Sequence, residues 1–134
     1  MTSMESVRPS VAAVHDRVTV HLDALDDATL VDQLRTLLGA RLVAYLAGAP
    51  STAAVSDYIT HAAAVPDHVR ARLKVAYSVA ALQHQLGATP SLIQAWFQGR
   101  NPRLDDRAPA QVIADDPCRF RGTLIAAAVT LVGG

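Results

Sequence analysis

The chain has 134 residues and balances twelve lysines and arginines against twelve acidic residues, so its net charge is zero at pH 7 with neutral histidines. This length suits one domain, and the balanced charge differs from the concentrated basic face of a strong nucleic-acid binder. The single cysteine, Cys118, excludes an internal disulfide and a metal site built from several cysteines.

Residues 1–25 show no sustained hydrophobic period, and we expect a flexible N-terminal arm or a short irregular helix there. Nothing in this segment has the charged and apolar regions of a secretion signal. The most apolar stretch of the chain is too short to cross a bilayer. We therefore expect a cytoplasmic protein that does not contact a membrane.

Residues 26–65 contain three short helical patterns. Asp26 and Asp27 precede a one-sided apolar stripe that ends at Gly39, which predicts a helix over about 26–38. A second helix is predicted over 41–48. Pro50 then supplies a turn, and Ser51 is a suitable N-cap for a third helix over 52–60.

Residues 66–134 begin with the longest predicted helix, from Pro66 at the first helical position to the residue before Gly87. Three further helix starts are marked by a residue followed by proline, at Thr89-Pro90, Ala108-Pro109 and Asp116-Pro117. Alanine is abundant and has the highest helix propensity, and no segment alternates with a strand-like period of two. We predict an all-α helical bundle with about seven helices.

The two short helices within residues 42–58 form a candidate helix-turn-helix, a motif that places its second helix in the major groove of DNA. In this interpretation residues 51–60 are the recognition helix, and the candidate DNA contacts are Arg41, Ser51, Thr52, Ser56 and Arg70. Recognition helices reach base edges with Arg, Lys, Asn or Gln, whereas this one offers hydroxyl groups and the acidic Asp57. Two interpretations stay open here: a helix that reads DNA, and a helix pair that serves only as scaffold.

Residues 94–113 are the most informative segment for function. They contain the only tryptophan, Trp96, next to Phe97 at the end of a predicted helix. Residues that restrict the backbone follow, at Gly99, Asn101-Pro102 and Ala108-Pro109. Shaped loops commonly carry binding surfaces, and Trp and Arg are enriched at interface hot spots. Trp96 alone is better explained as a large piece of the core, but the loop as a whole indicates a binding surface.

This segment resembles the toxin-binding domain of the Xre/MbcA/ParS antitoxin family. The signature of that family is a tryptophan-containing helix, Asn-Pro-x-Leu, a short polar turn, Arg-x-Pro and an apolar helix. The matching positions here are Trp96, Asn101, Pro102, Leu104, Arg107, Pro109, Val112 and Ile113. The similarity covers about residues 40–134, with its specific part at 93–113, and implies that residues 66–134 form a toxin-binding domain after a helix-turn-helix-like region over 26–65.

The resemblance implies an antitoxin that binds and neutralises a RES-domain toxin, an enzyme that degrades NAD. The implied toxin-binding residues are Trp96, Asn101, Pro102, Leu104, Arg107 and Pro109, together with the C-terminal Leu131 and Val132. If Leu104 and Arg107 lie at the interface, replacing both with alanine should leave folding intact. The resemblance also implies a homodimer that binds operator DNA and represses its own operon.

Two positions depart from the family pattern. Residues 56–58 read Ser-Asp-Tyr, where members that bind DNA often carry Arg and Trp. Asp105 and Asp106 stand where a glycine is common. DNA binding and the backbone shape of the turn therefore need separate evidence.

We expect no enzymatic activity, no metal and no cofactor. The five histidines are scattered, and the chain has no glycine-rich phosphate-binding motif. The acidic pairs at 105–106 and 115–116 are explained by turn and capping chemistry. The alternatives to an antitoxin are a DNA-binding transcriptional regulator of Xre type without a toxin partner, and an adaptor that keeps the fold but has lost its toxin.

Overall fold

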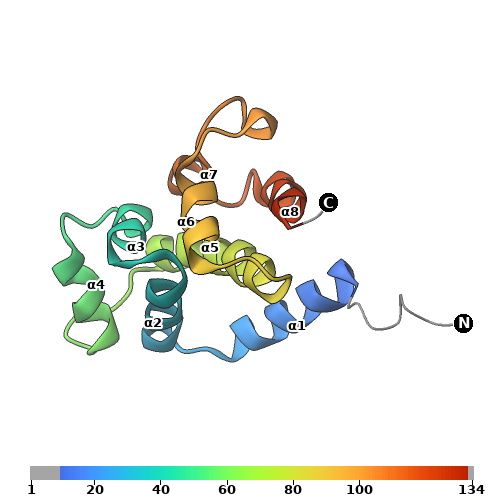
Figure 1. The fold of residues 1–134 in the computed structure, drawn as a ribbon. Coiled ribbons are helices and arrows are strands. Elements are labelled where there is room, and N and C mark those ends of the chain that lie inside the picture. Colours follow the sequence, from blue (N-terminus) through green and yellow to red (C-terminus); the bar gives the residue numbers. More distant parts are fainter. Residues whose placement is uncertain (1–9, 133–134) are drawn as a thin grey trace, which may run out of the picture.

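A computed structural model describes residues 10–132 of the chain, and within them it contains eight α-helices, a 3-10 helix and no strand (Figure 1). The helices are α1 (Val11–Ala24), α2 (Asp27–Leu38), α3 (Ala40–Ala47), α4 (Thr52–Ile59), α5 (Asp67–Gln85), α6 (Pro90–Gln98), η2 (Pro102–Leu104), α7 (Pro109–Asp115) and α8 (Arg121–Leu131). The all-α prediction is confirmed.

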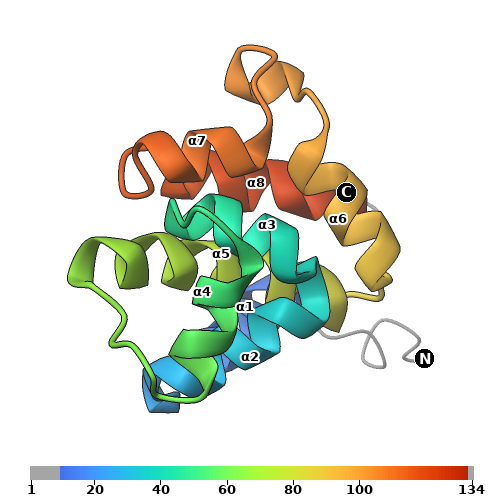
Figure 2. The same ribbon diagram turned by 90° about the vertical axis from the view of Figure 1, so that its left-hand side faces the viewer.

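The nineteen-residue helix α5 forms the centre of the molecule, with other helices around it (Figures 1 and 2). It packs against α1, α2, α3, α6, α7 and α8. Leu73, Ala76, Val79 and Leu82 on this helix have no exposed surface. Alanines among the larger residues let neighbouring helices approach closely. The helix begins at Asp67, one residue later than expected, because Pro66 has extended backbone angles and is the N-cap.

One hydrophobic core runs through the described residues. It includes buried side chains from α1, α2 and α5 and continues through α7 to Leu124 of α8. The segments 26–65 and 66–134 therefore share a core, and the boundary near residue 65 does not separate two independent ones.

Of the two expectations for residues 1–25, the flexible arm is wrong for residues 11–24, which form the regular fourteen-residue helix α1 in place of a short irregular one; residues 1–9 lie outside the described part of the chain. The Ser10 side chain caps this helix by accepting a hydrogen bond from the Ala13 N–H at 3.0 Å. Val14, Val18 and Leu22 follow at intervals of four and are buried on the side that faces α5. This contact to a distant part of the sequence holds the N-terminal helix in place.

Helices α3 and α4 are joined by a four-residue turn in which Gly48 adopts a left-handed conformation, with φ of 68°. Both helices contact α2 and each other, so the three form one compact unit. Val55 is the only fully buried side chain of α4, which leaves most of this helix at the surface. Ser51 is at the N-cap as predicted, but its side chain makes no capping hydrogen bond.

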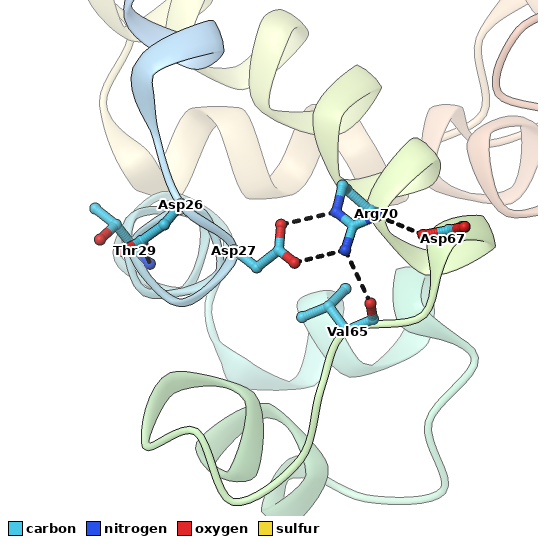
Figure 3. Close-up of polar contacts among 6 residues, drawn as sticks. All are labelled: Asp26, Asp27, Thr29, Val65, Asp67 and Arg70. Atoms are coloured by element: carbon cyan, nitrogen blue, oxygen red, sulfur yellow. Dashed lines mark hydrogen bonds and ion pairs between the residues drawn. The ribbon is translucent and has the colours of Figure 1, made fainter.

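Arg70 joins three parts of the chain near the start of α5 (Figure 3). Its Nε and Nη2 donate to the two carboxylate oxygens of Asp27 on α2, at 2.8 and 2.6 Å. Nη1 donates to Asp67 at 2.6 Å, and Nη2 also donates to the Val65 carbonyl oxygen at 3.1 Å. A two-pronged arginine–carboxylate pair of this kind fixes both distance and orientation. It therefore fastens the connection between α4 and α5 onto the start of α2.

The sequence predicted that the last helix begins at Asp116-Pro117, but it begins at Arg121. Asp116 instead ends α7, because its N–H still donates to the Val112 carbonyl oxygen. Its side chain then accepts a hydrogen bond from the Arg119 N–H at 3.2 Å, which forms a turn before α8.

Candidate protein-binding surface

Residues 99–108, here called the α6–α7 loop, project from one end of the molecule in both overall views (Figures 1 and 2). Gly99 ends α6. The Asn101 N–H then donates to the Arg107 carbonyl oxygen at 3.2 Å, which closes the loop at its base. The segment is thus a closed unit between two helices.

Asn101 organises the backbone inside this loop. Its carbonyl oxygen accepts hydrogen bonds from Leu104 and Asp106, at 2.9 and 3.0 Å. Its side-chain oxygen accepts a third from the Arg103 N–H at 3.0 Å. Pro102 lies between these partners at the start of η2, where its fixed φ suits the helical turn. The Asn-Pro pair therefore sets the shape of the loop tip.

Asp105 and Asp106 both have positive φ values, 56° and 60°. Side chains other than glycine rarely adopt this left-handed conformation, and aspartate is among those that tolerate it. Two consecutive residues in this conformation reverse the chain sharply, so that Arg107 returns to Asn101. The acidic pair keeps the turn without the glycine expected there, at a cost in backbone strain.

Arg107 connects the loop to the rest of the C-terminal region. Its Nε donates to the Leu104 carbonyl oxygen at 3.4 Å, and its Nη1 is 3.8 Å from an Asp115 carboxylate oxygen at the end of α7. The guanidinium carbon is 5.0 Å from the centre of the Phe120 ring, close enough for a cation–π contact. Arg107 thus ties together η2, α7 and the residue that precedes α8.

Leu104 and Pro109, which the family resemblance places at a toxin interface, are buried within this chain. The Leu104 side chain is 2% exposed, and η2 packs against α8. These two residues anchor the loop and are not part of its exposed surface. Because Leu104 packs inside the chain, we now expect the double alanine variant of Leu104 and Arg107 to lose stability.

The exposed side chains of the loop are those of Arg100, Pro102, Arg103, Asp105 and Asp106. Asn101 is partly exposed at its base. This surface carries charges of both signs at its tip. The structure therefore keeps Asn101 and Pro102 as candidate contacts and adds the charged side chains around them, which have no strong signal in the sequence.

Trp96 lies at the margin of the core. Its ring meets the fully buried ring of Phe97 edge to face, with 5.3 Å between the centroids and an interplanar angle of 76°. The indole is partly exposed on α6. It belongs both to the core and to the surface beside the loop.

Leu131 and Val132 are half-buried at the C-terminal end of α8. Phe120, which contacts Arg107, precedes the other end of that helix. At 1.5 Å per residue, the two ends of α8 are about 15 Å apart. The predicted toxin-binding residues therefore divide into the loop with Trp96, and a separate C-terminal group.

The candidate DNA contacts fall into two groups. The exposed ones are Arg41 on α3, Ser51 at the N-cap of α4, and Thr52 and Ser56 on α4. Arg70 is not available to a DNA phosphate, because its guanidinium is engaged by two carboxylates and a carbonyl oxygen. These contacts argue against the predicted role of Arg70 in DNA binding.

Several side chains that look scattered in the sequence meet elsewhere in the fold. His21 of α1, Gln33 of α2 and Tyr77 of α5 line a cavity together with Arg17 and His84. Their separation of up to 67 positions leaves no spacing that sequence analysis could recognise.

Within residues 10–132, no three His, Cys, Asp or Glu side chains form a group that could hold a metal ion. No helix in this range is long and apolar enough to cross a membrane.

Comparisons with known proteins gave no match: no family model, no curated protein and no solved structure is significantly similar to this chain.

Proposed function

We propose that this protein is an antitoxin that binds and neutralises a RES-domain toxin through the α6–α7 loop and the neighbouring surface of α6. The observation that carries the proposal is the loop with the preceding Trp96 of α6, because Trp96, Asn101, Pro102 and Arg107 occur at the spacing of the Xre/MbcA/ParS signature. Leu131 and Val132 contribute a second contact at the end of α8.

The internal bonding of the loop suits protein recognition. Its backbone is held from within by Asn101, and its base is fastened by Arg107. A loop that is ordered before binding loses less conformational entropy when a partner docks. Its exposed arginines and aspartates can then set orientation and specificity through charge.

Co-expression with the product of the adjacent gene tests this proposal. We expect that product to be a RES-domain protein that depletes cellular NAD when expressed alone, and to co-purify with this chain without depleting NAD. Arg103→Ala at the loop tip should weaken the complex, whereas Arg41→Ala on α3 should leave it unchanged. A neighbour without a RES domain, together with no co-purified complex, contradicts the proposal.

A second function has its own structural support: DNA binding by an Xre-type regulator, either beside toxin binding or in its place. The arrangement of α3, the turn at Gly48 and the exposed α4 is compatible with a helix-turn-helix. Against it, the exposed positions of α4 (Thr52, Ala53, Ser56 and Asp57) include no cation. A gel-shift assay with the chain's own promoter at increasing salt decides the matter. A complex that prefers one DNA sequence and weakens steeply with salt supports DNA binding. The absence of any shifted band at low salt contradicts it.

A further inference from the structure

A cavity of about 460 Å³ lies between α1, α2 and α5, and it shares no residue with the α6–α7 loop. Its volume is within the range of small-molecule sites, roughly 300–1,000 Å³. The buried side chains of Val18, Leu37 and Ala81 supply apolar lining. A mainly apolar lining with a few polar groups is the usual construction of such a site.

The polar lining is arranged around Gln33. Its side-chain oxygen accepts a hydrogen bond from the Tyr77 hydroxyl at 2.8 Å, and His21 Nε2 lies 3.4 Å from the same oxygen. A carbonyl oxygen only accepts, so Nε2 of His21 carries a proton. Both acceptor positions of the Gln33 oxygen are therefore used, and its NH2 group remains as a donor.

The protonated nitrogen of His84 can be assigned in the same way, from the carbonyl oxygen that it contacts. Its Nδ1 is 3.1 Å from the Ala88 carbonyl oxygen, so Nδ1 carries the proton and Nε2 is the nitrogen left for other partners. With Arg17, the lining thus contains one permanent cation and two imidazole rings. Among the described residues that line the cavity there is no aspartate or glutamate.

We propose that this cavity binds a small organic anion, with its carboxylate beside Arg17 and its apolar body against Val18, Leu37 and Ala81. The charge of the lining selects an anion, because no carboxylate competes for Arg17 within the cavity. The apolar lining selects a ligand with a hydrocarbon or aromatic body over a simple inorganic ion. The site does not depend on the proposed toxin binding.

Benzoate is a suitable probe, since it combines a carboxylate with an apolar ring. Titration into the full chain, followed by NMR of the methyl groups of Val18, Leu37 and Ala81, should give saturable shifts with a Kd on the order of 1 mM, as expected for so small a ligand. Benzamide has the same size without the charge, and acetate has the charge without the ring. Both should bind at least about fivefold more weakly.

Arg17→Gln should weaken benzoate binding about fivefold. Arg121→Gln, which removes an exposed arginine outside the cavity, is the matched control and should leave the Kd unchanged. The proposal is overturned if benzoate gives no saturable shift up to about 20 mM, if benzamide or acetate binds as tightly as benzoate, or if both arginine variants behave alike. Should Arg17→Gln fail to fold, the comparison of the three probes on the unaltered chain decides alone.

Discussion

At the scale of single residues, charge and backbone geometry account for the tightest local features. Asp27 accepts two hydrogen bonds from Arg70, and these bonds hold the pKa of its carboxyl below the ordinary value of 3.8. A carboxyl group whose pKa is lower in the folded than in the unfolded chain stabilises the fold at pH values above its pKa in the unfolded chain. That contribution is lost as the pH falls through the folded pKa.

We therefore expect Asp27→Asn to lower the urea midpoint at pH 7, and the difference from the unaltered chain to close as the pH falls below 3.8. Asp32→Asn, which removes an exposed pair with Arg35 on one helix, is the control and should have a smaller effect at pH 7. A difference that stays constant down to acid pH would show that the carboxylate charge is not involved.

Asp106→Gly should stabilise the protein by about 1 kcal/mol, because glycine adopts the left-handed conformation at this position without the steric cost of a side chain. Gly48→Ala is the reverse change. It should destabilise by about 1 kcal/mol, because φ there is 68° and the new methyl group would lie 3.3 Å from Arg72 Nη1. Urea denaturation measures both, and a destabilising Asp106→Gly contradicts the strain argument.

At the scale of elements, one buried side chain anchors the α6–α7 loop. Leu104→Ala should cost about 2–4 kcal/mol, since it leaves a cavity between η2 and α8. Arg103→Ala next to it is exposed and should change stability by less than about 0.5 kcal/mol. Chemical denaturation of the two variants compares them directly. Equal, small losses would mean that Leu104 is not packed as the structure has it.

Helix α1 offers a similar comparison. Leu22→Ala should cost about 2–4 kcal/mol because Leu22 packs into the shared core. Val20→Ala on the same helix removes a side chain that is 71% exposed and should cost about 0.5 kcal/mol or less. If residues 11–24 were a flexible arm, neither substitution would change the denaturation midpoint.

The all-α class and several helix starts could be predicted from the sequence, because helix propensity and capping depend on neighbouring residues. Thr89 precedes α6 and caps it, and Pro109 begins α7, as expected. Helix α2 begins within one residue of the predicted start, with Asp26 as its N-cap. The sequence could not decide between an arm and a helix over residues 1–25, because α1 has about one buried residue per turn and packs against α5, more than forty positions away.

At the candidate site, too, the sequence predicts features that depend on neighbouring residues but not those that depend on distant helices. The sequence marks Asn101-Pro102 and Arg107 as shape-determining, and the bonds they make agree with that role. Which side of the loop faces outward depends on α8, which covers Leu104 from a later part of the chain. The cavity at Gln33 depends on three helices at once, and no local pattern encodes it.

At the scale of the whole molecule, α5 is the central helix and packs against α1, α2, α3, α6, α7 and α8. The fragment 66–134 keeps α5 but lacks α1, α2 and α3, which cover much of its surface. We expect this fragment to show little cooperative unfolding and poorly dispersed NMR signals, because an incomplete core cannot offset the entropy of folding. The full chain should unfold in one transition. A well-folded fragment would show that the C-terminal part is an independent domain.

The Asn-Pro pair at the base of the α6–α7 loop also bears on how the protein ages. Asparagine in exposed loops commonly deamidates when the backbone nitrogen of the next residue attacks the side-chain amide and closes a five-membered succinimide ring. The nitrogen after Asn101 belongs to Pro102 and carries no hydrogen, so this ring cannot form in the usual way. The asparagine on which the loop depends is thereby protected from conversion to isoaspartate, which would lengthen the backbone by one carbon and break the bonds that Asn101 makes to Arg103, Leu104 and Asp106.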